Sequence, residues 1–374
     1  MDMKLDQGQE MLRSTARQFL EAECPISLVR ELESNGQWHS SEIWERMSDL
    51  GWLGMTIPVE YGGGGGTLLD QLVLAEEMGR ALLPGPFMTS DILCGQLLLN
   101  TGNEEQKREF LPMMSSGNAI FALALAEKNP GLTSYGLTTT GMNSKDGYRI
   151  NGTKLVVPYA ATAEYFICGF NNNRPNQGLG LALVLAKSPG VLITPLKSIA
   201  NYPRGKVDFC NVVVREQSLL GIPGKADKPL KLAIEYATLI QSVEMVGRAQ
   251  KILEMVVDYS KTRVQFGRPI GSFQAVQHQC ADLRVAIDVA RLLVYRGACS
   301  LADGQTSYEQ VAMAKVAANE TSRKATATGH GIFAGISYTL DHDMQMFSAR
   351  NKLAEASMGN TISHINEIAL LMGF

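Results

Sequence analysis

Long apolar runs are absent from this chain of 374 residues. A helix that spans a bilayer needs roughly 18–20 consecutive apolar residues, and no stretch of the sequence approaches that length. Residues 1–7 carry neither the basic nor the apolar segment of a secretory signal peptide. We therefore expect a cytoplasmic protein with no membrane-spanning helix.

Cysteine and histidine are too few and too scattered to suggest a metal site. The five histidines show no ligand spacing, and no two of the six cysteines form a CxxC pair. The cysteines are Cys24, Cys94, Cys168, Cys210, Cys280 and Cys299. Such spacing also argues against disulfides, so the sequence predicts buried free thiols and no bound metal.

A large excess of charge of one sign is also missing. The chain has 34 basic and 37 acidic residues, a net charge of −3, which gives no reason to expect a nucleic acid or an anionic membrane as partner. Apolar residues make up 45% and charged residues 19%, as in ordinary globular proteins. The length predicts about two or three domains with a substantial core.

The spacing of apolar residues divides the chain into three parts. Helical spacing runs through residues 1–119, and it returns from residue 226 to 374. Between them, residues 120–225 contain short apolar or alternating runs, which predict a small β-barrel or sandwich. Turn signals separate these runs at Asn129-Pro-Gly, Asp146-Gly, Asn151-Gly and Ser188-Pro-Gly. The C-terminal helices are expected at about 228–262, 273–302, 306–330, 341–358 and 361–372, which fits a helix bundle.

Five consecutive glycines, Gly62–Gly66, first suggest a phosphate-binding loop. The lysine and hydroxyl residue of a Walker loop do not follow them, so that interpretation is weak. A glycine-rich turn is the better prediction.

The segment from Tyr259 to His278 joins two helical patterns and carries the clearest chemistry. Glycine and proline end the first helix, and Ser272 is placed to cap the second. Arg263 and Arg268 then lie beside a helix N-terminus, where fixed positive charge and unpaired N–H groups suit a phosphate. From these residues alone, an ordinary helix–turn–helix connection with solvated arginines remains the alternative.

This segment resembles the R-x-x-F-G-x-x-[IL]-x-x-[FH]-Q-x-[VI]-x-[HF] signature of the acyl-CoA dehydrogenases, and the resemblance extends along nearly the whole chain. Other matching stretches are the glycine-rich turn, Asn151-Gly-Thr-Lys154 and the loop Gly329–Thr339. The resemblance implies an α+β fold with an N-terminal α-helical domain, a middle β-barrel and a C-terminal four-helix bundle. It also implies FAD, an acyl-CoA substrate, a homodimer or homotetramer, and electron-transfer flavoprotein as electron acceptor.

The same resemblance assigns residues to the flavin site. The expected cofactor-binding residues are Arg263, Phe266, Gln274, Leu125, Ala126, Pro158, Gly331 and Gly335. Some of these depart from the family pattern. The T-E-x-x-x-G-S run appears here as Ala126-Glu127 followed by residues 128–134 without a Gly-Ser pair, and Gly331 replaces the loop glutamine.

Neither position at which the family carries its catalytic glutamate holds an acid here. The first corresponds to Met358, followed by Gly359, and the second to Ala237. A thioether cannot accept a proton in this reaction. Glu355 lies one helical turn before Met358, and we expect it to be solvated or ion-paired.

Asp91 is the candidate base that remains. It stands in Thr89-Ser-Asp91, before an expected helix at Ile92–Leu99, in the part of the family's N-terminal domain that lies near the acyl end of the substrate. A cyclic 2-enoyl-CoA has no acidic α-hydrogen, so its proton would leave from a more distant ring carbon that such a carboxylate could reach. The alternative, given equal weight, is that Asp91 only caps the helix.

Three functions follow from these residues. The first is an FAD-dependent acyl-CoA dehydrogenase that uses a displaced base to introduce a C=C bond into the acyl group. An alicyclic or bulky acyl group is the candidate substrate. The second is a non-catalytic or half-site subunit of a heterotetramer with a related chain. The third is a binding protein that keeps the fold and has lost the flavin.

Overall fold

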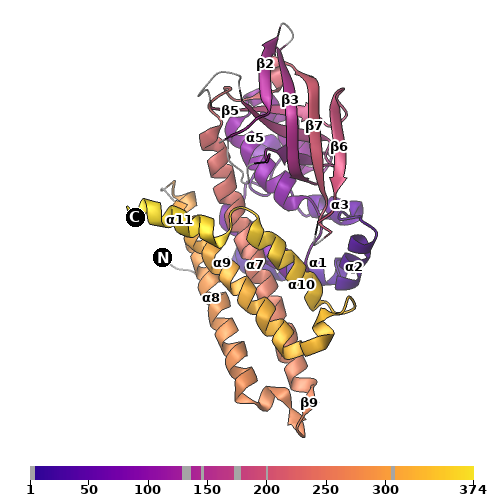
Figure 1. The fold of residues 1–374 in the computed structure, drawn as a ribbon, viewed down its shortest axis with the longest axis vertical. Helices are drawn as coiled ribbons and strands as arrows, with labels where there is room; N and C mark the ends of the chain where they lie inside the picture. The colour runs from indigo at the N-terminus through magenta and orange to yellow at the C-terminus, as the bar shows by residue number, and fades with distance from the viewer. Residues whose placement is uncertain (1–4, 129–135, 145–146, 172–177, 199–200, 305–307) are drawn as a thin grey trace. The chain divides into compact units, whose positions relative to one another are not determined.

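The structure, a computed structural model, describes residues 5–128, 136–144, 147–171, 178–198, 201–304 and 308–374. Helices come first along the chain, strands follow, and helices return (Figure 1). The expected fold class, with a helical N-terminal part, a β-sheet middle part and C-terminal helices, is therefore confirmed. The turn expected at Asn129-Pro-Gly and residues 129–134 lie outside the described residues, as does residue 146 of the Asp146-Gly turn.

The N-terminal part is built from short helices with well-defined beginnings. Asp6 and Gln9 form a reciprocal capping box at the start of the first helix, and Asn103 and Gln106 form another. The helical elements here are α1 (Gln7–Glu23), α2 (Ile26–Ser34), α3 (Ser41–Asp49), η1 (Val59–Tyr61), α4 (Leu68–Ala81), the π-helix η2 (Met88–Cys94), α5 (Gly95–Thr101) and α6 (Glu104–Ser115).

The middle part is one eight-stranded mixed sheet in the order β6-β7-β3-β2-β4-β5-β8, with β1 paired to β4. The strands are β1 (Phe121–Ala124), β2 (Thr140–Ser144), β3 (Gly147–Pro158), β4 (Tyr165–Asn171), β5 (Leu179–Leu185), β6 (Val191–Leu196), β7 (Arg204–Val214) and β8 (Leu219–Leu220), with η3 (Glu216–Ser218) before the last. The turn expected at Asn151-Gly is wrong, because these residues lie inside β3, where the pairing with β7 shifts register.

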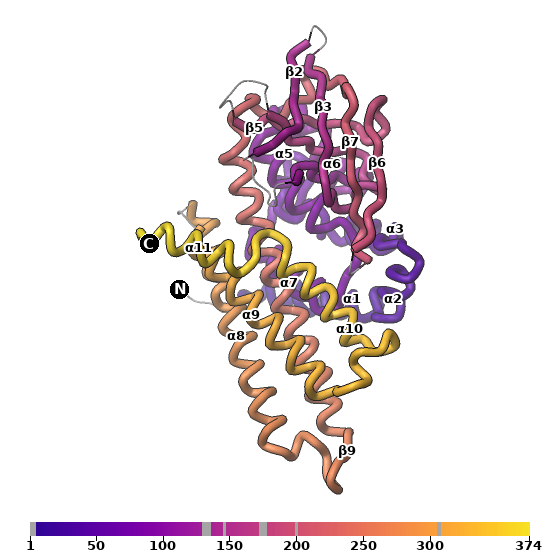
Figure 2. Tube along the Cα trace, in the orientation of Figure 1, coloured from indigo at the N-terminus to yellow at the C-terminus, as the bar shows by residue number. Residues whose placement is uncertain are grey.

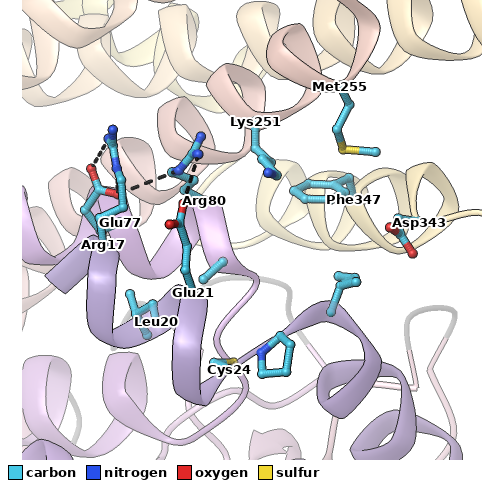
Figure 3. A pocket seen from close by; sticks show the side chains of 13 residues that line it. Arg17, Leu20, Glu21, Cys24, Glu77, Arg80, Lys251, Met255, Asp343 and Phe347 are labelled. Carbon is cyan, nitrogen blue, oxygen red and sulfur yellow. Dashed lines mark hydrogen bonds and ion pairs between the residues drawn. The ribbon is translucent and has the colours of Figure 1, made fainter. Parts of the chain in front are cut away.

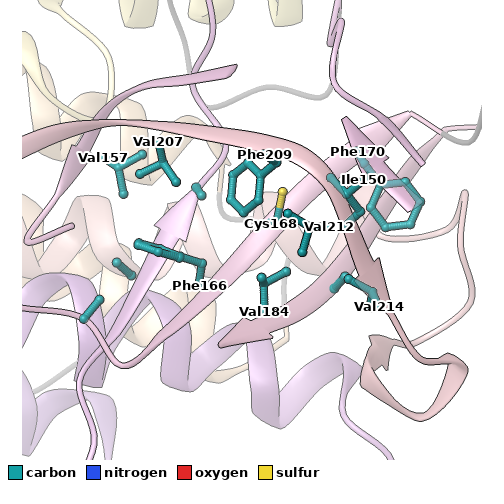
Figure 4. Packing of buried hydrophobic residues seen from close by; sticks show 14 of the residues in the cluster. Ile150, Val157, Phe166, Cys168, Phe170, Val184, Val207, Phe209, Val212 and Val214 are labelled. Carbon is teal, nitrogen blue, oxygen red and sulfur yellow. The ribbon is translucent and has the colours of Figure 1, made fainter. Parts of the chain in front are cut away.

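The inner face of the sheet is packed with aromatic and β-branched side chains (Figure 4). Phe170 of β4 belongs to this cluster, lies beside Ile150 in Figure 4 and is fully buried. Gly141 and Gly180 make room for its ring, since a Cβ on either would come within 2.6 Å of a ring carbon. The alternation of the strand sequences therefore builds a core that depends on two glycines facing one phenylalanine.

The C-terminal helices begin and end close to the expected positions. They are α7 (Asp227–Thr262), α8 (Gln274–Ala302), α9 (Tyr308–Phe333), α10 (Met344–Ala356) and α11 (Thr361–Leu371). A small hairpin of β9 (Val264–Gln265) and β10 (Arg268–Pro269), with η4 (Ile270–Ser272), joins α7 to α8, and η5 (Ala334–Tyr338) follows α9. Helices α8 and α9 run side by side in Figure 2.

The structure divides into two compact units, which are described separately below. The helical unit comprises Met1–Glu31, Leu68–Leu83 and Thr238–Phe374, and the sheet unit comprises Leu32–Thr67 and Pro84–Ala237. The domain limits expected at 119/120 and 225/226 stay a prediction.

Within the described residues, no helix is long and apolar enough to cross a membrane. All six cysteines are unpaired, and Cys24, Cys94 and Cys168 are buried, as expected, whereas Cys210 is exposed. No group of histidine, cysteine or acidic residues in the described ranges is arranged to hold a metal ion.

Candidate functional site

Asp91 lies in the middle of the π-helix η2 in the sheet unit, and only 6% of the residue is exposed. Its carboxylate oxygen Oδ1 accepts a hydrogen bond from the backbone N–H of Gly54 at 2.5 Å. The preceding residue, Ser90, accepts a hydrogen bond from the backbone N–H of Phe121, which joins η2 to the first strand of the sheet. π-helical turns are rare and occur often at functional sites.

Burial raises the pKa of Asp91 to about 7, and the hydrogen bond from Gly54 opposes this rise. A carboxylic acid with a pKa near neutrality is present in both protonation states at pH 7. Such a group is suited to general acid–base chemistry.

The alternative role of Asp91 as a helix cap is wrong. The helical segment begins at Met88, after Phe87, rather than at Ile92, and α5 continues directly from η2. Neither start has a side-chain cap. Asp91 is inside the helix, and its carboxylate accepts a hydrogen bond from Gly54 in a loop distant in sequence.

The connection between α10 and α11 holds Met358, at the position where the family carries its glutamate. Met358 adopts a left-handed backbone conformation with φ +54°, and its carbonyl accepts a hydrogen bond from His364 Nε2 at 2.9 Å. Glu355, one turn earlier, lies 2.9 Å from Arg323 and 3.2 Å from Lys352, which confirms the expectation that it is ion-paired. These partners outweigh the effect of burial and lower the pKa of Glu355. Ala237, at the other position, is fully buried in α7.

Two titratable groups of the helical unit whose pKa values are shifted were not predicted from the sequence. Glu244 of α7 has its pKa raised by burial, against the opposing effect of Arg248. Lys315 of α9 is fully buried, and burial lowers its pKa to about 7. Its ammonium group donates hydrogen bonds to Gln241 Oε1 and to the carbonyl of Ala354, both at 2.7 Å.

Arg263, Phe266 and Gln274 lie together at the end of the helical unit where α7 passes into α8. The hairpin β9–β10 is closed by a hydrogen bond from Ile270 N–H to the Arg263 carbonyl at 2.8 Å. Phe266 lies at the hairpin tip in a left-handed conformation and is 91% exposed. Arg263 and Gln274 are also exposed. An uncovered aromatic ring beside an arginine suits the binding of a ligand that carries both an aromatic ring and phosphates.

The expectation that Ser272 caps α8 is wrong. Its hydroxyl donates to the carbonyl of Pro269 at 2.7 Å and so closes the 3₁₀ turn η4. Helix α8 begins at Gln274, after Phe273, without a side-chain cap. Gln274 is in the first turn, as expected.

Leu125 and Ala126 follow β1 in the sheet unit, and Pro158 is the last residue of β3. The carbonyl of Ala126 accepts from the N–H of Leu155 at 2.7 Å, and Leu125 is fully buried. Gly331 and Gly335 lie in the helical unit, at the end of α9 and in η5, and a Cβ added to either would meet no described atom within 4 Å. Open space beside these backbones is compatible with the close approach of a cofactor.

A buried ion pair supports the Leu125–Ala126 backbone, and the sequence indicates it only through the match of Lys154 to the N-G-x-K motif. Lys154 is fully buried, and its ammonium group lies 2.8 Å from Glu127 Oε1 and 3.2 Å from the Leu125 carbonyl. Burial alone would raise the pKa of Glu127. Hydrogen bonds from Lys154, Thr138 and Thr139 outweigh that effect and lower the pKa to about 2.

The helical unit also contains a cavity of about 280 Å³ between α1, α4, α7 and α10 (Figure 3). Charged side chains on its wall are paired with each other. Arg17 makes two hydrogen bonds to Glu77, at 2.6 and 2.9 Å, and Arg80 lies 3.5 Å from Glu21. Sequence patterns gave no sign of this cavity.

Two family models match the chain over residues 6–118 and 231–372, which together cover more than half of it. They are described as "Acyl-CoA dehydrogenase, N-terminal domain" and "Acyl-CoA dehydrogenase, C-terminal domain". The chain belongs to the acyl-CoA dehydrogenase family. It is an FAD-dependent oxidoreductase that acts on the CH–CH group of acyl-CoA thioesters.

Known relatives match the chain over nearly its whole length. Acryloyl-CoA reductase (NADH) of Anaerotignum propionicum is 29% identical over 373 residues, which cover 97% of this chain and 94% of the relative. A glutaryl-coenzyme A dehydrogenase in complex with glutaryl-CoA is 26% identical, with a TM-score of 0.94 and coverage of 100% of this chain and 96% of the other.

Members of the family also form complexes. The structure of the ChsE4-ChsE5 complex from Mycobacterium tuberculosis contains a chain 25% identical to this one, with a TM-score of 0.90 and complete coverage of both chains. A further relative, 27% identical over 92% of both chains, is the subunit CarC of the caffeyl-CoA reductase-Etf complex of Acetobacterium woodii.

Proposed function

We propose that the chain is an acyl-CoA dehydrogenase in which Asp91 replaces the usual glutamate as catalytic base. The observation that carries the proposal is a buried carboxylic acid with its pKa raised to about 7. The residues at the two usual base positions, Met358 and Ala237, cannot accept a proton. Glu355 is unsuited as well, because its ion pairs lower its pKa.

The substrate that fits a displaced base is an alicyclic or similarly bulky acyl-CoA, such as a cyclic 2-enoyl-CoA. The α-carbon of this substrate carries no removable hydrogen, so Asp91 takes a proton from a more distant ring carbon. A second ring C–H bond breaks with loss of hydride, and the ring gains one C=C bond. FAD, when bound, supplies the hydride acceptor.

We propose that the cofactor is held by the residues already described in three groups. Arg263, Phe266 and Gln274 would contact its phosphate and adenosine parts, because exposed positive charge and an uncovered ring suit them. Leu125, Ala126 and Pro158 would contact the flavin ring, with Gly331 and Gly335 giving room for close approach. Reoxidation by electron-transfer flavoprotein and assembly as a homodimer or homotetramer complete the proposal.

Anaerobic reduction of the flavin tests the choice of base. Wild type, Asp91→Asn and Glu244→Gln are mixed with straight-chain, branched and alicyclic acyl-CoAs, and the loss of oxidised flavin absorbance is followed. Asp91→Asn should lose about 100-fold or more of the reduction rate. Asp258→Asn, at an exposed acid of α7, is the matched control and should react as wild type does.

Unchanged reduction in Asp91→Asn would refute the role of Asp91. Loss of reduction in Glu244→Gln alone would assign the base to Glu244 of α7, the other carboxyl described above whose pKa is raised.

A half-site subunit is the second candidate, favoured by the absence of an acid at Met358 and by the similarity to a chain of the ChsE4-ChsE5 complex. Under this alternative a related chain would complete the flavin site. Flavin content separates the two. One flavin per chain in the isolated protein supports the complete enzyme, whereas substoichiometric flavin that is restored by a co-expressed partner supports the half-site subunit.

A further inference from the structure

The glycine run Gly62–Gly66 lacks the lysine and hydroxyl residue of a phosphate-binding Walker loop. In the sheet unit it folds back along residues 54–58. Four of its backbone N–H groups donate to carbonyls of that segment. The hydrogen bonds are Gly63 N to Pro58 O at 3.2 Å, Gly64 N to Gly54 O at 3.0 Å, Gly65 N to Ile57 O at 2.9 Å and Gly66 N to Met55 O at 2.8 Å. Two irregular segments are thereby joined along their length, as strands are in a sheet.

A side chain at Gly63, Gly64 or Gly65 would crowd this arrangement. A Cβ on Gly63 would lie 2.1 Å from the Ile57 carbonyl oxygen, and one on Gly64 would lie 3.1 Å from the Met55 carbonyl oxygen. Gly65 has φ +63°, a conformation that other residues rarely adopt, and its Cβ would lie 3.0 Å from a methyl carbon of Val59. The run of glycines is therefore explained by close backbone contact.

Gly54 is the residue at which this arrangement reaches Asp91. Its carbonyl accepts from Gly64 N–H, and its own N–H donates to Asp91 Oδ1. Gly54 has φ +66°, and a Cβ there would lie 2.1 Å from Ser115 Oγ. The glycine run therefore contacts one of the two peptide groups of Gly54, and Asp91 accepts a hydrogen bond from the other.

The charged groups of the elements that pack most closely against η2 lie on α6. The elements packed against η2 are β1, α5 and α6. The first two carry no charged residue. Helix α6 carries Glu104, Glu105, Lys107, Arg108 and Glu109, all exposed except the half-buried Lys107, and neighbouring Glu60 is exposed as well. The shift of the Asp91 pKa has burial and the Gly54 hydrogen bond as its causes.

We propose that the glycine run is a positioning device for Asp91, which fixes the Gly54 peptide so that its N–H orients the carboxylate and stabilises its ionised form. This inference rests on the proposed function of Asp91 as base. A donated hydrogen bond favours the charged carboxylate, so weakening it favours the neutral acid. The base would then be less available at neutral pH.

The test compares Gly65→Ala with Gly36→Ala. Gly36 has φ +69° and no atom within 4 Å of its Cβ, so both variants impose similar backbone strain and only the first disturbs the glycine run. Titration of Asp91 is read from the carboxylic acid C=O band in infrared difference spectra, with Asp91→Asn subtracted. We expect Gly65→Ala to raise the titration midpoint by about one pH unit, and Gly36→Ala to leave it in place.

An unchanged midpoint in folded Gly65→Ala would overturn the inference. If that variant does not fold, Gly64→Ala replaces it, since its backbone is not strained and its Cβ disturbs the contact with Met55. The acidic limb of the kcat profile should move with the infrared midpoint. If the midpoint shifts but no acyl-CoA reduces the flavin of the wild-type protein, the inference about the glycine run is supported and the proposed function is refuted.

Discussion

Asp91 makes the stability of the protein depend on pH in an unusual direction. Its pKa is about 7 in the folded state, compared with 3.8 for an ordinary aspartate. Between these values the folded state keeps the proton and the unfolded state has lost it. The contribution of Asp91 to folding stability therefore falls as pH rises from about 4 to about 7 and is constant above that range, whereas ion-paired carboxylates give the opposite trend.

The magnitude follows from the size of the shift. About three pH units at 1.36 kcal/mol per unit give about 4 kcal/mol of stability that is present at pH 4 and absent at pH 8. Other carboxylates titrate in the same range, so the useful quantity is the difference between wild type and Asp91→Asn, which cannot ionise. Urea unfolding at several pH values, with fixed protein and FAD concentrations, measures this difference.

We expect wild type to lose about 4 kcal/mol relative to Asp91→Asn between pH 4 and pH 8. A difference that stays flat would mean that Asp91 titrates near its ordinary pKa. The case for a base poised at neutral pH would then fail, even if Asp91→Asn were inactive for another reason.

Three further predictions concern groups outside the proposed base. Gly79→Ala should cost about 2–3 kcal/mol in urea unfolding, because its Cβ would lie 2.2 Å from a carbonyl oxygen of α7. Lys154→Met should cost about 3–5 kcal/mol by leaving the Glu127 carboxylate unpaired, and the added change Glu127→Gln should recover part of the loss. The free energy of unfolding of wild type should rise by about 4 kcal/mol relative to that of Lys315→Met between pH 7 and pH 10.5. In this range Lys315 is protonated in the unfolded state but not in the folded state, because burial lowers its pKa to about 7.

The ends of α7, α8 and α11 could be predicted to within one residue because their signals are local, whereas those of α9 and α10 differ by two or three residues. Apolar residues recur at helical spacing along α7 and along α8, and Gly267 and Pro269 mark the break between the two helices. Ion pairing of Glu355 was also predictable, since its partner Lys352 lies one turn away on the same helix. The role of Ser272 was predicted wrongly because its hydroxyl can bond either to the 3₁₀ turn η4 or to the first turn of α8. The sequence does not distinguish these two partners.

The candidate site depends on contacts between residues distant in sequence, and these left little trace in the local pattern. Asp91 reads as a helix cap because a π-helix has no recognised sequence signal, and its contact with Gly54 crosses 37 residues. Lys154 and Glu127 are separated by 27 residues, and a lysine in an alternating strand is ordinarily exposed. The glycine run signals a special backbone conformation without indicating which residue it serves.

Environment, rather than residue type, separates the carboxylates of this protein by role. Glu127 and Asp91 are both buried in the sheet unit, yet one has a pKa of about 2 and the other of about 7. Lys154 and two threonine hydroxyls hold Glu127 ionised, so it can accept a proton only at very low pH and serves to fix the backbone at Leu125. For Asp91, burial raises the pKa and the hydrogen bond from Gly54 lowers it. A base must gain and lose its proton near the working pH, and of these two carboxylates only Asp91 meets that condition.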